Sequence, residues 1–244
     1  MIDSIIFDFG GVLAWPKWDI KMISNIIAKK LLNYNISTPP EFPKILNDVI
    51  GECLRESTCS QREIPFEEII KESFRRLGIE IPDEVAYQAM LEVSDAELHN
   101  LKPEAKKVLM TLKEMGLKIG VLSNTSLFLV RRLLEKKSLI KYIDAVVLSR
   151  EIGYRKPHPI IYWEMIRRLN TEPQKSIFVG DVLEIDIYGA KRIGMIGVLL
   201  SKPEPVYREY KINFECLGVP KELKPDYIIS NLEEIIEIVK ELMK

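Results

Sequence analysis

The chain has 244 residues, a length typical of one large domain or two modest ones. Its 35 Lys and Arg residues balance 36 Asp and Glu residues. The net charge of −1 argues against a dedicated binder of nucleic acid or of anionic membranes, which needs a basic face. Only two histidines occur, His99 and His158, which excludes a three-histidine zinc site. If the protein is an enzyme, we expect carboxylate chemistry.

The N-terminus and the cysteines indicate a cytoplasmic protein. The first residues, MIDSIIFDFG, carry acids where a secretory signal has a basic start and an apolar run. Apolar stretches such as residues 194–200 stay far below the ~20 residues that span a bilayer. Cys53, Cys59 and Cys216 form no CxxC pair, so we expect reduced thiols, with Cys53 and Cys59 in helix packing. Few glutamines beside abundant Glu and Lys favour a heat-adapted source.

Short apolar runs alternate with helical patterns along most of the chain. Residues 4–7 predict a buried strand that ends before a Gly-Gly turn. Residues 15–95 show helical spacing alone, which indicates an inserted helical segment. Its expected helices span 17–32, 42–54, 66–77 and 85–98.

From residue 103 onward the pattern alternates between helix and strand. The expected strands span 117–122, 145–148, 176–179, 196–200 and 227–229. The expected helices span 103–115, 127–137, 159–169, 185–193 and 232–243. The strands are nearly continuous apolar runs, which is typical of a parallel sheet with helices on both faces. The sequence therefore predicts an α/β fold with an inserted all-helical segment.

Polar side chains stand just after four of the predicted strands. Asp8 follows the first strand, and Ser123 and Asn124 follow the second. Lys156 ends the loop after the third strand, and Asp181 follows the fourth, with Asp186 five residues further on. Each is an ordinary cap, turn or surface residue when taken alone. Because ligands of parallel sheets bind at the carboxyl ends of the strands, their joint occurrence predicts one site.

The residue types at this edge predict a metal and a phosphoryl group. Asp8 and Asp181 on adjacent strand ends would repel each other unless a cation lay between them. Oxygen ligands without histidine favour a hard ion, Mg²⁺ before Ca²⁺. The Lys156 ammonium, the Ser123 hydroxyl and helix N-terminal amides add affinity for an anion. This combination fits phosphoryl transfer through an aspartyl-phosphate intermediate.

Four stretches of the chain resemble the ordered motifs of the haloacid dehalogenase (HAD) superfamily. They are residues 7–13 (FDFGGVL), 122–124 (LSN), 153–157 (GYRKP) and 180–186 (GDVLEID), with YGAKRIGM at 188–195. The resemblance implies a Rossmann-like core, formed by residues 1–14 and 96–244. It also implies that residues 15–95 form the small helical cap that closes over the site.

The resemblance also implies a role for each matching residue. Asp8 would be the nucleophile and a ligand of Mg²⁺, with Asp181 and the Gly10 carbonyl as further ligands. Ser123, Asn124 and Gly11 would bind the phosphate, together with Lys156, which would also neutralise charge in catalysis. Asp186 would hold Lys156 or a metal-bound water. The implied activity is a Mg²⁺-dependent phosphatase acting on a small phosphorylated metabolite, such as a sugar phosphate.

One position departs from the family pattern. Phosphatases of this family usually carry a second Asp two residues after the nucleophile, where it acts as general acid and base. Here that position is Gly10. General acid–base catalysis contributes about 10²–10⁴-fold, so its loss predicts slower turnover. The departure leaves two alternatives open: a 2-haloacid dehalogenase, and a catalytically weakened binding or regulatory protein. Asp181 argues against the dehalogenase, since family dehalogenases usually have an uncharged residue there.

Overall fold

A parallel sheet forms the centre of the molecule. The computed structural model describes residues 1–17, 19–96, 98–201 and 205–244. Six strands in this part of the chain pair in the order β5-β4-β1-β6-β7-β8, all parallel. They are β1 (Ser4–Phe7), β4 (Lys118–Ser123), β5 (Ala145–Leu148), β6 (Ser176–Gly180), β7 (Ile196–Leu200) and β8 (Tyr227–Ile229). The predicted α/β fold and its strands are confirmed.

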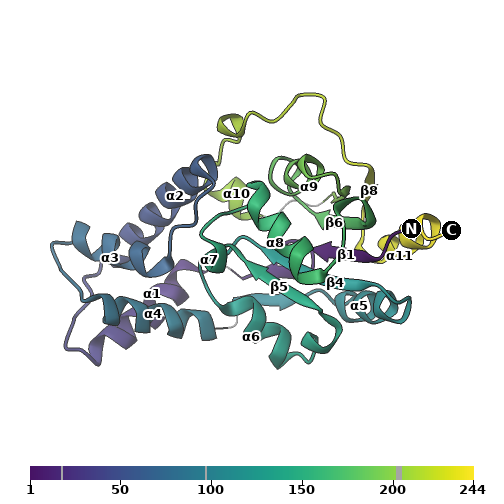
Figure 1. Ribbon diagram of the computed structural model, residues 1–244. Coiled ribbons are helices and arrows are strands. Elements are labelled where there is room, and N and C mark those ends of the chain that lie inside the picture. Colours follow the sequence, from purple (N-terminus) through teal and green to yellow (C-terminus); the bar gives the residue numbers. More distant parts are fainter. Residues whose placement is uncertain (18, 97, 202–204) are drawn as a thin grey trace.

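Helices cover both faces of the sheet (Figure 1). The core helices are α5 (Ala105–Glu114), α6 (Leu129–Lys136), α7 (Ser149–Ile152), α8 (Pro159–Leu169), α9 (Tyr188–Arg192), α10 (Pro205–Glu209) and α11 (Ile235–Leu242). Successive residues of a strand point to opposite faces of the sheet, so the side chains of β1 contribute to two hydrophobic cores. Ile6 packs with Tyr162 of α8 and Phe178, whereas Ile5 and Phe7 belong to the larger core on the other face.

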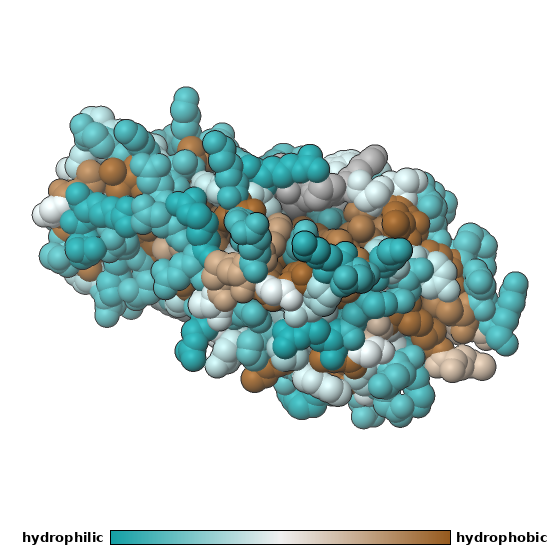
Figure 2. Space-filling model, turned by 90° about the horizontal axis from the view of Figure 1, so that it is seen from above, coloured by the Kyte–Doolittle hydropathy of each residue, from teal (hydrophilic) through white to brown (hydrophobic). Residues whose placement is uncertain are grey.

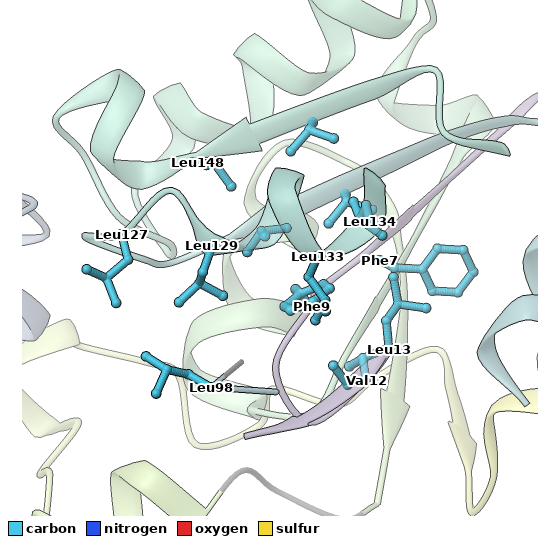
Figure 3. Close-up of a cluster of buried hydrophobic side chains, with 14 of the residues drawn as sticks. Phe7, Phe9, Val12, Leu13, Leu98, Leu127, Leu129, Leu133, Leu134 and Leu148 are labelled. Carbon is cyan, nitrogen blue, oxygen red and sulfur yellow. The ribbon is translucent and has the colours of Figure 1, made fainter. Parts of the chain in front are cut away.

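The larger core joins the sheet to the loop that follows β1. Figure 3 shows Phe7 and Phe9 close to Leu133 and Leu134 of α6, with Val12 and Leu13 beside them. These side chains are almost or fully buried, and burying each contributes about 1.5–3 kcal/mol relative to exposure. The loop that carries Asp8 is therefore anchored on both sides by apolar packing.

Four helices form a separate bundle on one side of the sheet (Figure 1). They are α1 (Ile20–Leu32), α2 (Phe42–Ser60), α3 (Phe66–Arg76) and α4 (Asp83–Asp95). The Asp19 side chain caps α1 by accepting from the Lys21 and Met22 amides, and Pro65 and Pro82 precede α3 and α4. We call these four helices the cap.

A short ribbon joins the cap to the sheet. The strands β2 (Ala14–Pro16) and β3 (His99–Leu101) pair antiparallel, with Pro16 opposite His99. The sequence analysis did not predict them, because three-residue strands carry too little pattern. The last predicted cap helix also ends at Asp95 rather than at residue 98, since the chain turns there into β3.

The cysteine prediction was wrong for two of the three residues. Cys59 at the end of α2 and Cys216 in the turn η4 (Glu215–Leu217) form a disulfide, and both residues are exposed. Figure 1 shows the chain after α10 passing beside α2 before it returns to β8. The pairing was hidden because 157 positions separate the two cysteines. Cys53 stays a free thiol.

The surface is mainly polar. Figure 2 shows hydrophilic side chains over most of one face, with hydrophobic ones in separate patches between them. Among the described residues, no helix combines the length and the apolar character needed to cross a membrane.

Candidate active site

Three adjacent strands place polar groups at one edge of the sheet. Phe7 at the end of β1 lies level with Val121 of β4 and Val179 of β6. The following residues, among them Asp8, Ser123 and Asp181, therefore emerge together, and all three are buried. The Asp8 amide donates to the Val179 carbonyl at 2.9 Å, which extends the pairing to the predicted nucleophile.

Lys156 reaches this edge from the loop between α7 and α8. Its Nζ lies 2.7 Å from Asp8 Oδ1 and 2.7 Å from Asp186 Oδ1. The Asn124 side chain holds the Lys156 backbone in place. Asn124 Nδ2 donates to the Lys156 carbonyl at 3.1 Å, and the Lys156 backbone amide donates to Asn124 Oδ1 at 2.8 Å. Asn124 thus contacts the backbone of Lys156 on both sides, a positioning contact that the sequence did not indicate.

Burial and charge set the protonation of this pair. Burial raises the pKa of Asp8 to about 6, although the Lys156 ammonium opposes the shift. Burial by itself lowers the pKa of Lys156, but the Asp186 and Asp8 carboxylates outweigh it and hold that pKa above its usual range. Lys156 therefore stays charged and favours an ionised Asp8.

Asp186 organises the turn after β6. Its Oδ2 accepts from the Asp181 amide at 3.1 Å and the Val182 amide at 3.0 Å, while Oδ1 faces Lys156. It lies in η3 (Leu183–Ile187), a π-helical turn of the kind often found at functional sites. The carboxylate therefore links the backbone at Asp181 to the Lys156 ammonium.

The three buried aspartates fit a hard divalent cation. One oxygen from each of Asp8, Asp181 and Asp186 can be chosen so that all three lie within 4.8 Å of one another. Lys156 supplies one positive charge against their three negative charges. An oxygen-only donor set with a surplus of negative charge is the chemistry that Mg²⁺ prefers in proteins.

The two glycines after Asp8 occupy different places. Gly10 lines the cavity beside Asp8. Gly11 has φ +75°, and a Cβ there would overlap the Asp181 carboxylate. Its carbonyl accepts from the buried Lys102. Gly11 thus lets the loop pass close to Asp181, and among the described residues it is not part of the cavity wall.

A cavity of about 130 Å³ lies between the sheet edge and the cap. Asp8, Ser123, Asn124, Lys156 and Asp186 form part of its core side. Further lining residues were not predicted as site residues: Ile50, Cys53, Ser57, Glu63, Phe66 and Ile69 from the cap side, and His99, Thr125, Arg155 and Tyr207 from the rest of the chain. Arg155 precedes Lys156 in sequence and could have been found from that position, whereas Glu63 carries no sequence signal.

Comparison with known proteins assigns the family. A family profile described as haloacid dehalogenase-like hydrolase matches residues 5–199. A glyceraldehyde 3-phosphate phosphatase of Methanocaldococcus jannaschii is 31% identical and is matched over the whole length of both chains. The chain belongs to the haloacid dehalogenase-like hydrolases. A second relative of this family, the glyceraldehyde 3-phosphate phosphatase of Methanopyrus kandleri, is 31% identical over 70% of each chain.

Solved structures of haloacid dehalogenase-like proteins share the fold. A HAD phosphatase from Thermococcus onnurineus superposes with a TM-score of 0.62 at 23% identity, over 98% of each chain. A 2-haloacid dehalogenase from Pseudomonas syringae gives a TM-score of 0.69 at 18% identity, over 99% of this chain and 100% of that one. At this identity both likenesses concern the fold alone.

Proposed function

We propose that this haloacid dehalogenase-like hydrolase is a Mg²⁺-dependent phosphatase that acts on a small phosphorylated metabolite, a sugar phosphate or a similar phosphomonoester. The observation that carries the proposal is the Asp8 carboxylate, held 2.7 Å from Lys156 within a buried cluster of three aspartates. Relatives at 31% identity, two named glyceraldehyde 3-phosphate phosphatase and one named ribulose-1,5-bisphosphate 5-phosphatase, support the same activity.

The proposed reaction proceeds in two displacements. An Asp8 oxygen attacks phosphorus, the ester P–O bond breaks, and an aspartyl phosphate forms. The alkoxide leaving group takes a proton from water, because Gly10 has no side chain that could act as the acid. Water then attacks the phosphorus, which releases inorganic phosphate and restores the Asp8 carboxylate. The Ser123 hydroxyl donates a hydrogen bond to a phosphoryl oxygen, and Lys156 offsets the negative charge of the phosphate.

Asp8, Asp181 and the Gly10 carbonyl are the groups we assign to Mg²⁺, with Asp186 holding Lys156 in place. When bound, Mg²⁺ would act as a Lewis acid on the phosphoryl oxygens. The substrate is the one partner we propose, a small molecule rather than a nucleic acid or a membrane. We also propose a cytoplasmic protein of a heat-adapted organism, where a disulfide such as Cys59–Cys216 is not unusual.

The test is hydrolysis of p-nitrophenyl phosphate and a panel of sugar phosphates, with Mg²⁺ and with a chelator. We expect activity that depends on Mg²⁺ and disappears in Asp8→Asn. Activity that survives chelation or that substitution contradicts the proposal.

Two other outcomes would decide for the alternatives. Halide release from 2-chloropropionate in chelator would identify a dehalogenase, although a buried Asp181 beside Asp8 does not suit that reaction. Binding of phosphate without turnover of any substrate would identify a binding protein.

A further inference from the structure

A second buried ion pair lines the cavity at its cap side. Glu63 follows α2 in the cap, and Arg155 immediately precedes Lys156 in the core. Arg155 Nη1 lies 2.9 Å from both carboxylate oxygens of Glu63, and the two side chains are only 8% and 2% exposed. Both residues line the cavity that holds Asp8 and Lys156.

Neighbouring groups hold this pair in place. The Ser149 hydroxyl donates to Glu63 and accepts from the Thr125 amide at 2.7 Å. Tyr207 interacts with the Arg155 guanidinium. The backbone is fixed as well, because the Glu63 amide donates to the Gly153 carbonyl at 3.0 Å and the Arg155 amide to the Gln61 carbonyl at 2.9 Å. Both members of the pair are therefore held by contacts besides the one between them.

In the part of the chain that the structure describes, every cation that lines the cavity already has a carboxylate partner. Among the described lining residues the formal charges are those of Asp8, Glu63, Arg155, Lys156 and Asp186. Lys156 is paired with Asp8 and Asp186, and Arg155 is paired with Glu63. A carboxylate on the tail of a substrate would have to displace Glu63 from Arg155 in a poorly solvated space, where like charges repel strongly.

Apolar side chains form much of the cap side of the cavity, and the space is small. Ile50, Ile64, Phe66 and Ile69 contribute aliphatic and aromatic surface from the cap. A cavity of about 130 Å³ favours a phosphoryl group with a short tail over one with a bulky tail.

We propose that Glu63 is a specificity-determining residue that keeps Arg155 paired and so excludes substrates with a second negative charge. The inference rests on the proposed phosphatase activity and narrows its substrates to compact phosphomonoesters whose tail, of about three carbons, carries hydroxyl or carbonyl groups but no carboxylate. Glu63 determines which substrates are accepted, and the chemical step takes place at Asp8.

The test compares two substrates that differ in one charge, glyceraldehyde 3-phosphate and 3-phosphoglycerate, at the same Mg²⁺ concentration. We expect the wild-type kcat/KM to favour the aldehyde by about 100-fold or more. Glu63→Gln frees the charge of Arg155, so the preference should fall by at least about tenfold, mainly through a lower KM for 3-phosphoglycerate.

Glu67→Gln is the matched control. Glu67 pairs with Arg150 at 2.7 Å across the same cap–core boundary, but neither residue lines the cavity. Its substitution should leave the substrate preference unchanged. Equal shifts in Glu63→Gln and Glu67→Gln would mean that Glu63 only holds the cap, and would overturn the proposal.

The wild-type protein alone keeps the proposal testable if Glu63→Gln does not fold, which thermal unfolding would reveal. A wild-type preference for 3-phosphoglycerate overturns it. Hydrolysis of p-nitrophenyl phosphate with neither three-carbon substrate accepted also overturns it, while the phosphatase assignment stands. No hydrolysis of any phosphate ester removes the phosphatase assignment and the inference together.

Discussion

The two sides of the cavity differ in how they handle charge. The core side concentrates it: three buried aspartates and Lys156 meet where β1, β4 and β6 end. Towards the cap the charge is neutralised, since Glu63 of the cap pairs with Arg155 of the core. The core side therefore suits a reaction on an anion, whereas the cap side suits selection of an uncharged tail. In our proposal the chemical step belongs to the sheet edge, and substrate selection belongs to the inserted helices.

The largest effect should follow from removing the cation of the core side. In Lys156→Met, Asp8 and Asp186 lose their common partner, and kcat/KM should fall by about 10²–10³-fold because an electrostatic contact to the phosphate is lost. Breaking a buried pair of this kind also costs about 3–5 kcal/mol of unfolding free energy. Steady-state kinetics and urea unfolding measure the two effects.

Lys113→Met is the control for that substitution. Lys113 pairs with Asp144 at 2.6 Å, but the two side chains are 36% and 37% exposed. Exposed pairs contribute about 0–1 kcal/mol, so activity and stability should barely change. Similar losses in Lys113→Met and Lys156→Met would show that the buried cluster has no special role.

The next effect concerns the covalent link between the cap and the rest of the chain. Cys59→Ser removes a disulfide whose cysteines are 157 positions apart, and a loop of this length predicts a loss of about 2–5 kcal/mol. Wild-type protein should lose the same stability in reductant, and Cys59→Ser should not respond to reductant. Cys53→Ser keeps the disulfide and should retain the response; a wild type indifferent to reductant contradicts the prediction.

The pH dependence of stability distinguishes His99 in the ribbon from Asp8 at the sheet edge. Burial lowers the pKa of His99 to about 4, from about 6.5 in an unfolded chain. Between these values the unfolded chain binds a proton that the folded protein rejects, so His99 reduces stability as the pH falls from 6.5 to 4, by up to about 3 kcal/mol. Asp8 has the opposite sign: its raised pKa means that the folded protein binds the proton more readily as the pH falls through about 6.

The difference between wild type and His99→Phe isolates the histidine, because Asp8 titrates in both. Urea unfolding at pH 7 and pH 4.5, in chelator, should show a larger loss for wild type than for His99→Phe. Phe preserves the ring contact with Phe9, whose centroid lies 5.3 Å away. Equal losses would mean that His99 is solvated and titrates normally.

The contrast between the two sides also explains what could be predicted from the sequence. Strands such as 145–148 and 196–200 were found because buried parallel strands are continuous apolar runs, and Asp8 and Asp181 were singled out because strand ends converge. Glu63 was not singled out, since its partner Arg155 lies 92 positions away in the sequence. In the sequence alone, Glu63 also cannot be told from a surface acid. The Cys59–Cys216 bond escaped for the same reason: long-range contacts leave no local pattern.

The smallest effect comes from restoring the acid that the core side lacks. Gly10 lies beside Asp8 in the cavity wall, at the position where phosphatases of this family usually carry the general acid. Gly10→Asp should raise kcat for an alkyl phosphate by about 10–10²-fold, because an alkoxide leaving group needs a proton. It should leave p-nitrophenyl phosphate nearly unchanged, since nitrophenolate departs without one. Gly10→Asn has the same shape without the acid, so equal rates for the Asp and Asn variants would show that protonation does not limit turnover.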